Sequence, residues 1–243
     1  MRRARLLAYA RWQASDFAFE RLPAIAVITA AFSAGAWLAI PGNLRSGLAA
    51  GDPDAVQNAL RLFANLLATV WFPVVIVASN QIVSGDRASG RFRLLFAKPV
   101  STRRYYLQAF AVNGLLFVAT MTVLLAPLAL LFRAPPGALQ ASAAIFAAAY
   151  LAVGGGCFLF SALIRLDWFA ITLVAFVEVL LDHHFGGQRW TRWLPPFHLV
   201  KGRIDALGDG LPADWHELGA LALTGLASVA IGVWLIRRRP LAT

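Results

Sequence analysis

The sequence contains little cysteine, little acid and few charged residues of any kind. Among its 243 residues there is a single cysteine, Cys157, so no disulfide can form within the chain. Charged residues make up 14% and hydrophobic residues 59%, whereas a soluble domain has roughly 25% charged and 45–50% apolar residues. This composition excludes a disordered chain, a collagen-like chain and a disulfide scaffold, and it argues against a soluble globular domain.

Long hydrophobic runs are abundant instead. A helix needs roughly 20 apolar residues to cross a hydrocarbon core about 30 Å thick, and five segments between charged residues are that long. A sixth is shorter and contains Glu178. Runs such as residues 144–153 do not alternate between polar and apolar positions, so helices are expected. We predict an all-α integral membrane protein of one domain, residues 1–243, with six spans at residues 22–40, 62–83, 106–132, 139–164, 166–185 and 217–236; five spans is the competing count.

Basic residues are distributed unevenly over the connections between these spans. With six spans both termini lie on one side, and that side holds 15 of the 22 Lys and Arg residues. The positive-inside rule therefore places both termini and the loop 84–105 in the cytoplasm, and the loop 186–216 outside. The excess of basic residues on the cytoplasmic side accounts for the net charge of +10. We accordingly expect a multi-pass protein of the inner or plasma membrane, in contact with lipid and not with nucleic acid.

Residues 3–20 precede the first span and have an amphipathic pattern. Small and apolar residues fall on one arc of a helix, and charged residues fall on the opposite side. The pattern predicts a helix that lies in the membrane interface, and a basic tail without regular structure is the alternative. The arc contains Leu6, Leu7, Ala10, Ala14, Phe17 and Ala18, and the charged side contains Arg2, Arg5, Asp16 and Glu20.

The loop 84–105 is the one long charged segment predicted inside the cell. After Gly90, apolar side chains such as Phe92 and Leu95 alternate with basic ones such as Arg91. Pro99 disfavours helix at the residue before it. The loop is therefore predicted to hold a short amphipathic helix between two membrane helices. Such a helix either lies on the bilayer or docks in the groove of a partner protein.

The order of motifs in this loop resembles that of the type-2 ATP-binding-cassette (ABC) exporter permeases. In that family an acidic stretch is followed by glycine, a Leu-rich stretch, Pro-Val-Ser and a basic residue. The matching residues here are Asp86, Gly90, Leu94-Leu95, Pro99-Val100-Ser101 and Arg103. The family also has six helices, an interfacial N-terminal helix, and a long last external loop with a Pro before an aromatic residue. Arg91 departs from the pattern, because the family usually has Thr there.

The resemblance implies a permease subunit that exports a substrate using ATP hydrolysed by a separate ATPase subunit, which would hold the ATP and Mg. A second permease subunit, identical or related, is also implied. Neither Lys98 nor Lys201 stands in a phosphate-binding loop, so this chain is not expected to be an enzyme or to hold a cofactor. The residues implied to contact the ATPase are Asp86, Arg87, Gly90, Arg91, Phe92, Leu95 and Pro99.

Two polar residues within predicted spans are candidates for the substrate path. Glu178 is the one acid predicted inside a span, and intramembrane acids suggest function. It either lines the path or forms a hydrogen bond to a neighbouring helix. Asn113 in the third span either lines the path or joins helices. The four histidines are expected at span ends, which favours an aromatic belt over a metal site. A membrane enzyme, a haem protein or a non-transporting anchor subunit remains the alternative to a permease.

Overall fold

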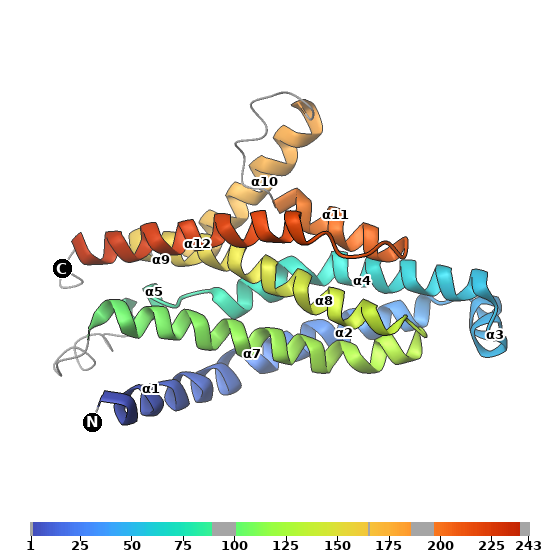
Figure 1. The fold of residues 1–243 in the computed structure, drawn as a ribbon, viewed down its shortest axis with the longest axis horizontal. Helices are drawn as coiled ribbons and strands as arrows, with labels where there is room; N and C mark the ends of the chain where they lie inside the picture. The colour runs from blue at the N-terminus through green and yellow to red at the C-terminus, as the bar shows by residue number, and fades with distance from the viewer. Residues whose placement is uncertain (1, 89–100, 165, 186–196, 239–243) are drawn as a thin grey trace.

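The computed structural model is almost entirely helical. It describes residues 2–88, 101–164, 166–185 and 197–238, and these contain no strand. The long helices run side by side along one axis of an elongated bundle (Figure 1). The prediction of an all-α fold is confirmed.

The described helices have the following bounds. In chain order they are α1 (Arg2–Asp16), the π-helix η1 (Phe17–Arg21), α2 (Leu22–Ala39), α3 (Gly42–Ala50), α4 (Pro53–Ser79), α5 (Ser84–Ala88), α7 (Thr102–Leu131), α8 (Pro136–Ala149), the π-helix η2 (Tyr150–Gly154), α9 (Gly155–Leu163), α10 (Asp167–Phe185), α11 (Phe197–Gly208) and α12 (Trp215–Arg238).

Five helical stretches of the described chain are long and apolar enough to cross a membrane, which is the character of a multi-pass membrane protein. They carry large apolar side chains on their outer surface, among them Val27 (68% exposed), Leu115 (73%) and Leu130 (80%). Such a surface suits contact with lipid. The five stretches are Leu7–Leu38, Pro53–Ser79, Thr102–Leu131, Gly137–Leu163 and Trp215–Arg238.

The chain does not break between the predicted interfacial helix and the first predicted span. One helix continues from α1 through η1 into α2. The face of α1 that packs on α7 carries Tyr9 and Gln13, and the Tyr9 ring lies edge-on to Tyr105 with centroids 5.9 Å apart. Leu7, which belongs to the predicted apolar arc, is 66% exposed. Ala18 is exposed as well, but Ala10 and Ala14 are half-buried and Phe17 is 1% exposed, so the protein itself covers part of the arc. Its placement in the membrane interface stays a prediction.

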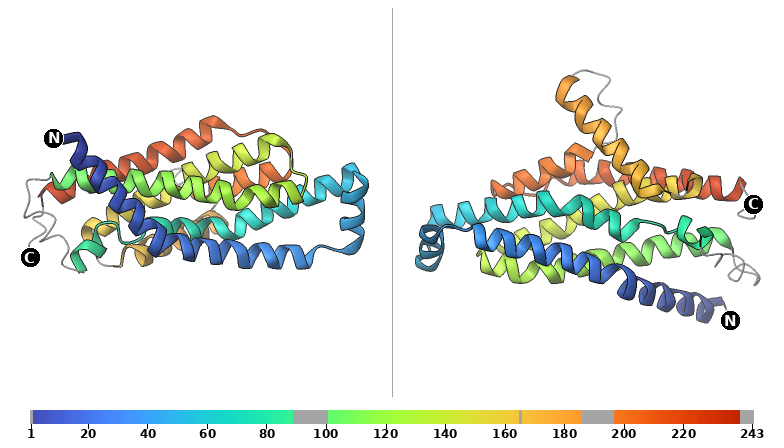
Figure 2. Two further views of the ribbon diagram at one scale, coloured as in Figure 1. Left: turned by 90° about the horizontal axis from the view of Figure 1, so that it is seen from below. Right: turned by 180° about the vertical axis from the view of Figure 1, so that it is seen from behind.

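The two ends of the bundle are distinct. The start of α1, the end of α12 and α5 lie together at one end, here called the α5 end, and α3 lies at the opposite α3 end (Figures 1 and 2). α10 leaves the bundle at an angle in both views and contacts α9 and α11. It is a helix close to the predicted bounds 166–185, but it is not among the five stretches that meet the length and hydropathy criteria for crossing.

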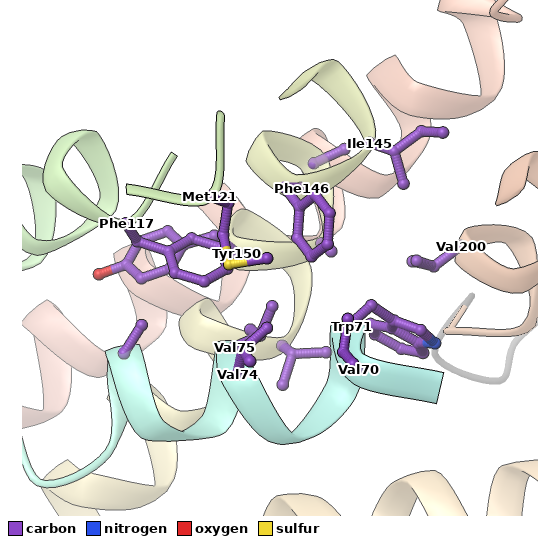
Figure 3. Packing of buried hydrophobic residues seen from close by; sticks show 14 of the residues in the cluster. Val70, Trp71, Val74, Val75, Phe117, Met121, Ile145, Phe146, Tyr150 and Val200 are labelled. Carbon is purple, nitrogen blue, oxygen red and sulfur yellow. The ribbon is translucent and has the colours of Figure 1, made fainter. Parts of the chain in front are cut away.

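The centre of the bundle is filled by aromatic side chains around Tyr150 (Figure 3). The Tyr150 ring stacks on Phe117 at 5.7 Å between centroids, and Phe117 meets Phe146 at 5.9 Å. The Tyr150 hydroxyl donates to the backbone carbonyl of Phe110 at 2.8 Å. The ring fits because residue 114 is glycine: a Cβ there would lie 2.5 Å from it. α7, α8 and η2 are thus joined by one packed aromatic cluster.

The backbone of α12 lies directly against the backbone of η2 and α9, because glycines at the contact leave no side chain between them. A Cβ built on Gly225 would overlap the backbone carbonyl of Leu151, and one on Gly155 would overlap the carbonyl of Gly225. Small residues permit this close approach between helices, which the sequence indicates by its run of glycine at 154–156.

Gly225→Ala is expected to destabilise the protein, because the obstructing atoms belong to backbone and cannot rotate away. Overpacking of this kind costs roughly 1–3 kcal/mol or more, measured as a lower Tm of the purified protein in detergent. The matched control is Gly219→Ala in the same helix, where a Cβ meets nothing within 4 Å. Equal Tm values for the two variants would contradict the backbone contact.

Candidate functional site

The turn between α4 and α5 is held by side chains that come from a distant part of the chain. Gln81 in this turn has φ 59°, a left-handed conformation that is uncommon for a residue with a Cβ. Its backbone N–H donates to Asp167 Oδ2 at 2.9 Å. The N–H groups of Val83 and Ser84 donate to Ser161 Oγ at 3.1 and 2.7 Å. The ends of α9 and α10 therefore satisfy the free donors of the turn and of the first residue of α5.

Asp167 is the charged member of this junction. Besides Gln81, it accepts a hydrogen bond from the Ser84 hydroxyl at 3.5 Å and from the N–H of Trp168 at 3.0 Å. The carboxyl is a structural acceptor that fixes where α5 begins.

Arg21 ties the N-terminal helix to the same region. Its Nη1 and Nη2 donate to the backbone carbonyls of Ala78 at 3.1 Å and Asn80 at 2.9 Å. These carbonyls lie at the C-terminus of α4, where the last groups of a helix lack partners inside it and where a cation is favoured by the helix dipole. The elements η1, α4, α9 and α10 thus converge near the start of α5.

A cavity of about 390 Å³ opens beside this junction and is here called the junction cavity. It is lined by α1, η1, the end of α4, the start of α5 and the first half of α7. Asp86 and Asn113, two of the residues singled out from the sequence, lie on its wall. Its lining residues are Gln13, Asp16, Glu20, Arg21, Val77, Asn80, Gln81, Ile82, Gly85, Asp86, Tyr105, Ala109 and Asn113.

Of the other residues predicted to contact an ATPase, only Arg87 belongs to the part of the chain that the structure describes. Arg87 lies in α5. Gly90, Arg91, Phe92, Leu95 and Pro99 lie outside the described residues. The amphipathic helix expected between α4 and α7 therefore stays a prediction, and the structure supplies the anchored segment from which it would extend.

Glu178 lies elsewhere, where α10 meets α11. It is 1% exposed, and its Oε1 lies 2.6 Å from His198 Nδ1 and accepts the backbone N–H of His198 at 3.2 Å. His198 is the second residue of α11, so the carboxylate satisfies a free donor at the start of that helix. Of the two interpretations above, the hydrogen bond to a neighbouring helix describes this geometry. Its Oε2 is buried without a hydrogen-bond partner in the described structure.

α4 carries a row of polar residues on its outer surface. Asn58, Arg61, Asn65 and Thr69, here called the α4 polar stripe, are all exposed. Their spacing of three and four residues places them on one face of the helix, and Asn65 and Thr69 fall inside the predicted span 62–83. Arg61 pairs with Asp209 at 3.3 Å, with both side chains 58% exposed. A cavity of about 450 Å³ at the α3 end is lined by the first three. The sequence analysis did not single out this surface, although the helical spacing of its polar residues could have indicated it.

Within the described part of the chain, no three His, Cys, Asp or Glu residues come close enough together to hold a metal ion. No family model and no curated protein matches the sequence. The class of protein rests on the fold: an all-helical membrane protein with several crossing helices, a polar junction at one end and a polar stripe on one face.

Asp167→Ala is expected to loosen the α4–α5 turn, because it leaves the Gln81 N–H without its acceptor. The loss is about 1–3 kcal/mol for a buried group left unpaired. Hydrogen–deuterium exchange should become faster in residues 80–86, and Tm should fall. Asp209→Ala is the control, since its exposed ion pair is worth only about 0–1 kcal/mol. Unchanged exchange in residues 80–86 would mean that Asp167 does not hold the turn.

Proposed function

We propose that this chain is the membrane-spanning permease subunit of an ABC transporter and exports a substrate with energy from a separate ATPase subunit. The α4 polar stripe is the observation that carries the proposal. Polar and charged groups that face lipid are costly, yet Asn65 and Thr69 are exposed on a helix suited to cross the membrane. Polar side chains in such a row are more stable next to water or protein than next to lipid. Two permease subunits that face each other through it would enclose a polar path.

Six crossings with both termini in the cytoplasm agree with the shape of the bundle. The start of α1 and the end of α12 lie at the α5 end (Figure 1), so the number of traverses is even. Five are the apolar stretches, and α10 and α11 together supply the sixth. α10 starts beside Gln81 at the α5 end, and the end of α11 reaches the α3 end, where the Gly208 carbonyl accepts from Gln57 at 2.9 Å. The α5 end, rich in Arg, is then the cytoplasmic one.

The anchored junction supports coupling to an ATPase. A partner that displaces the segment after Asp86 would pull on α5. The hydrogen bonds of Ser161 and Asp167 join the start of α5 to α9 and α10, and those of Arg21 join the end of α4 to η1. Motion of one short segment would therefore reach four helices. A non-transporting anchor subunit, the alternative considered above, needs neither this linkage nor an exposed polar stripe.

The partner is tested by affinity purification from native membranes. The wild-type chain should retain an ABC ATPase, identified by mass spectrometry. The double variant Phe92→Asp, Leu95→Asp should lose it while the helical circular dichroism spectrum is unchanged. The matched control is Leu211→Asp, Trp215→Asp, which adds the same charges at exposed apolar residues near the start of α12 and should retain the ATPase. Absence of an ATPase from the wild-type sample, or retention by the first variant, would refute the proposal.

The polar path is tested by the access of water to the stripe. Asn65→Cys and Thr69→Cys should react with a membrane-impermeant maleimide or form disulfides between two copies of the chain. Val123→Cys, 70% exposed on an apolar surface, is the lipid-facing control and should do neither. The native Cys157 is buried and gives the background. If Asn65→Cys reacts no faster than Val123→Cys, the stripe does not line a path.

A further inference from the structure

Four exposed arginines at the α5 end form no ion pair with a described acid. Arg103 and Arg104 lie in the first turn of α7, and Arg237 and Arg238 lie in the last turn of α12. Both of these helix ends lie at the α5 end (Figures 1 and 2), and α7 and α12 contact each other. The four residues are here called the arginine face.

The described acids toward the α5 end already have partners. Asp167 accepts hydrogen bonds from the α4–α5 turn, and Asp16, Glu20 and Asp86 each have an interaction partner. Arg21 lies toward the same end, but it is half-buried and donates to backbone carbonyls at the end of α4. The arginine face therefore carries positive charge that no described acid neutralises.

The arginine face continues directly into the apolar outer surface of both helices. Arg238, Trp234 and Ile231 follow one another at spacings of four and three residues, so they share one face of α12, and all three are exposed. The guanidinium of Arg238 lies over the Trp234 ring, 4.3 Å from its centroid. Arg104 and the exposed Leu115 are eleven residues apart, which is three turns of α7. The arginines thus lie where the lipid-facing surface ends, which is the level of the lipid headgroups.

We propose that the arginine face binds the headgroups of anionic phospholipids. A guanidinium pairs with two oxygens of one phosphate, and basic residues at the membrane surface attract negatively charged lipids. A zwitterionic lipid is bound less tightly, because its own cation opposes the arginines. The continuous apolar surface next to the arginines favours a lipid over a soluble protein as the partner, since a lipid offers an acyl chain beside its phosphate. The inference requires a membrane protein and does not require a permease.

The test is a titration of the purified full-length chain in detergent with phosphatidylglycerol and with phosphatidylcholine, followed by native mass spectrometry. Phosphatidylglycerol should bind about tenfold more tightly or better, and added salt should reduce this preference. One arginine near an anionic lipid contributes roughly fivefold in affinity. The double variants Arg103→Gln, Arg104→Gln and Arg237→Gln, Arg238→Gln should therefore each weaken phosphatidylglycerol binding by about fivefold or more and leave phosphatidylcholine binding unchanged.

Two further double variants control for folding and for position. Arg103→Lys, Arg104→Lys keeps the charge and should retain most of the preference for phosphatidylglycerol. Arg45→Gln, Arg133→Gln removes two exposed arginines near α3, at the opposite end of the bundle, and should leave the preference unchanged.

Several results would overturn the proposal. The wild-type chain could bind both lipids equally, the glutamine variants of the arginine face could keep the preference, or the control at the α3 end could lose as much of it. Displacement of phosphatidylglycerol by an equal concentration of inorganic phosphate would mean a site for free anions. If the glutamine variants keep phosphatidylglycerol but lose a co-purifying ATPase, the arginine face is a protein interface instead.

Discussion

Backbone groups that are removed from water must find their hydrogen-bond partners within the protein, and the structure depends on this constraint. Within a helix the requirement is met locally. Where a helix ends, a side chain from another segment meets it: Arg21 at the end of α4, Ser161 and Asp167 at the start of α5, and Glu178 at the start of α11. Each of these four side chains is thus explained by an interruption of the helical backbone.

These interruptions also organise the fold. The contacts of Arg21 with α4 and of Asp167 with the α4–α5 turn join segments that are far apart in the sequence, and both lie at the α5 end. They hold α5 in place just where the chain continues into the segment predicted to dock on an ATPase. Glu178 occupies the equivalent position at the break between α10 and α11. Contacts between distant segments are therefore concentrated where the helical backbone is interrupted.

The α4 polar stripe and the junction cavity differ in how far their side chains are exposed. The α4 polar stripe is exposed on the outside of its own chain, although Arg61 pairs with Asp209 and the Thr69 hydroxyl donates to the Asn65 carbonyl. The junction cavity is enclosed by its own chain, and Asn113 and Gln13 are deeply buried in it. The proposed path between two subunits depends on the first surface only.

The sequence alone determined the helical class and the position of the long helices. Predicted segments 62–83, 106–132 and 217–236 correspond to Pro53–Ser79, Thr102–Leu131 and Trp215–Arg238, because a long apolar run in lipid has no stable alternative to a helix. It also singled out Glu178 and Asn113 as polar residues within spans and as candidates for the substrate path. Only the tertiary structure decided that Glu178 meets His198, that Asn113 shares a cavity with Asp86 and Gln13, and that the first helix continues unbroken from α1 to α2. These are contacts between distant segments, and periodicity within one segment carries no information about them.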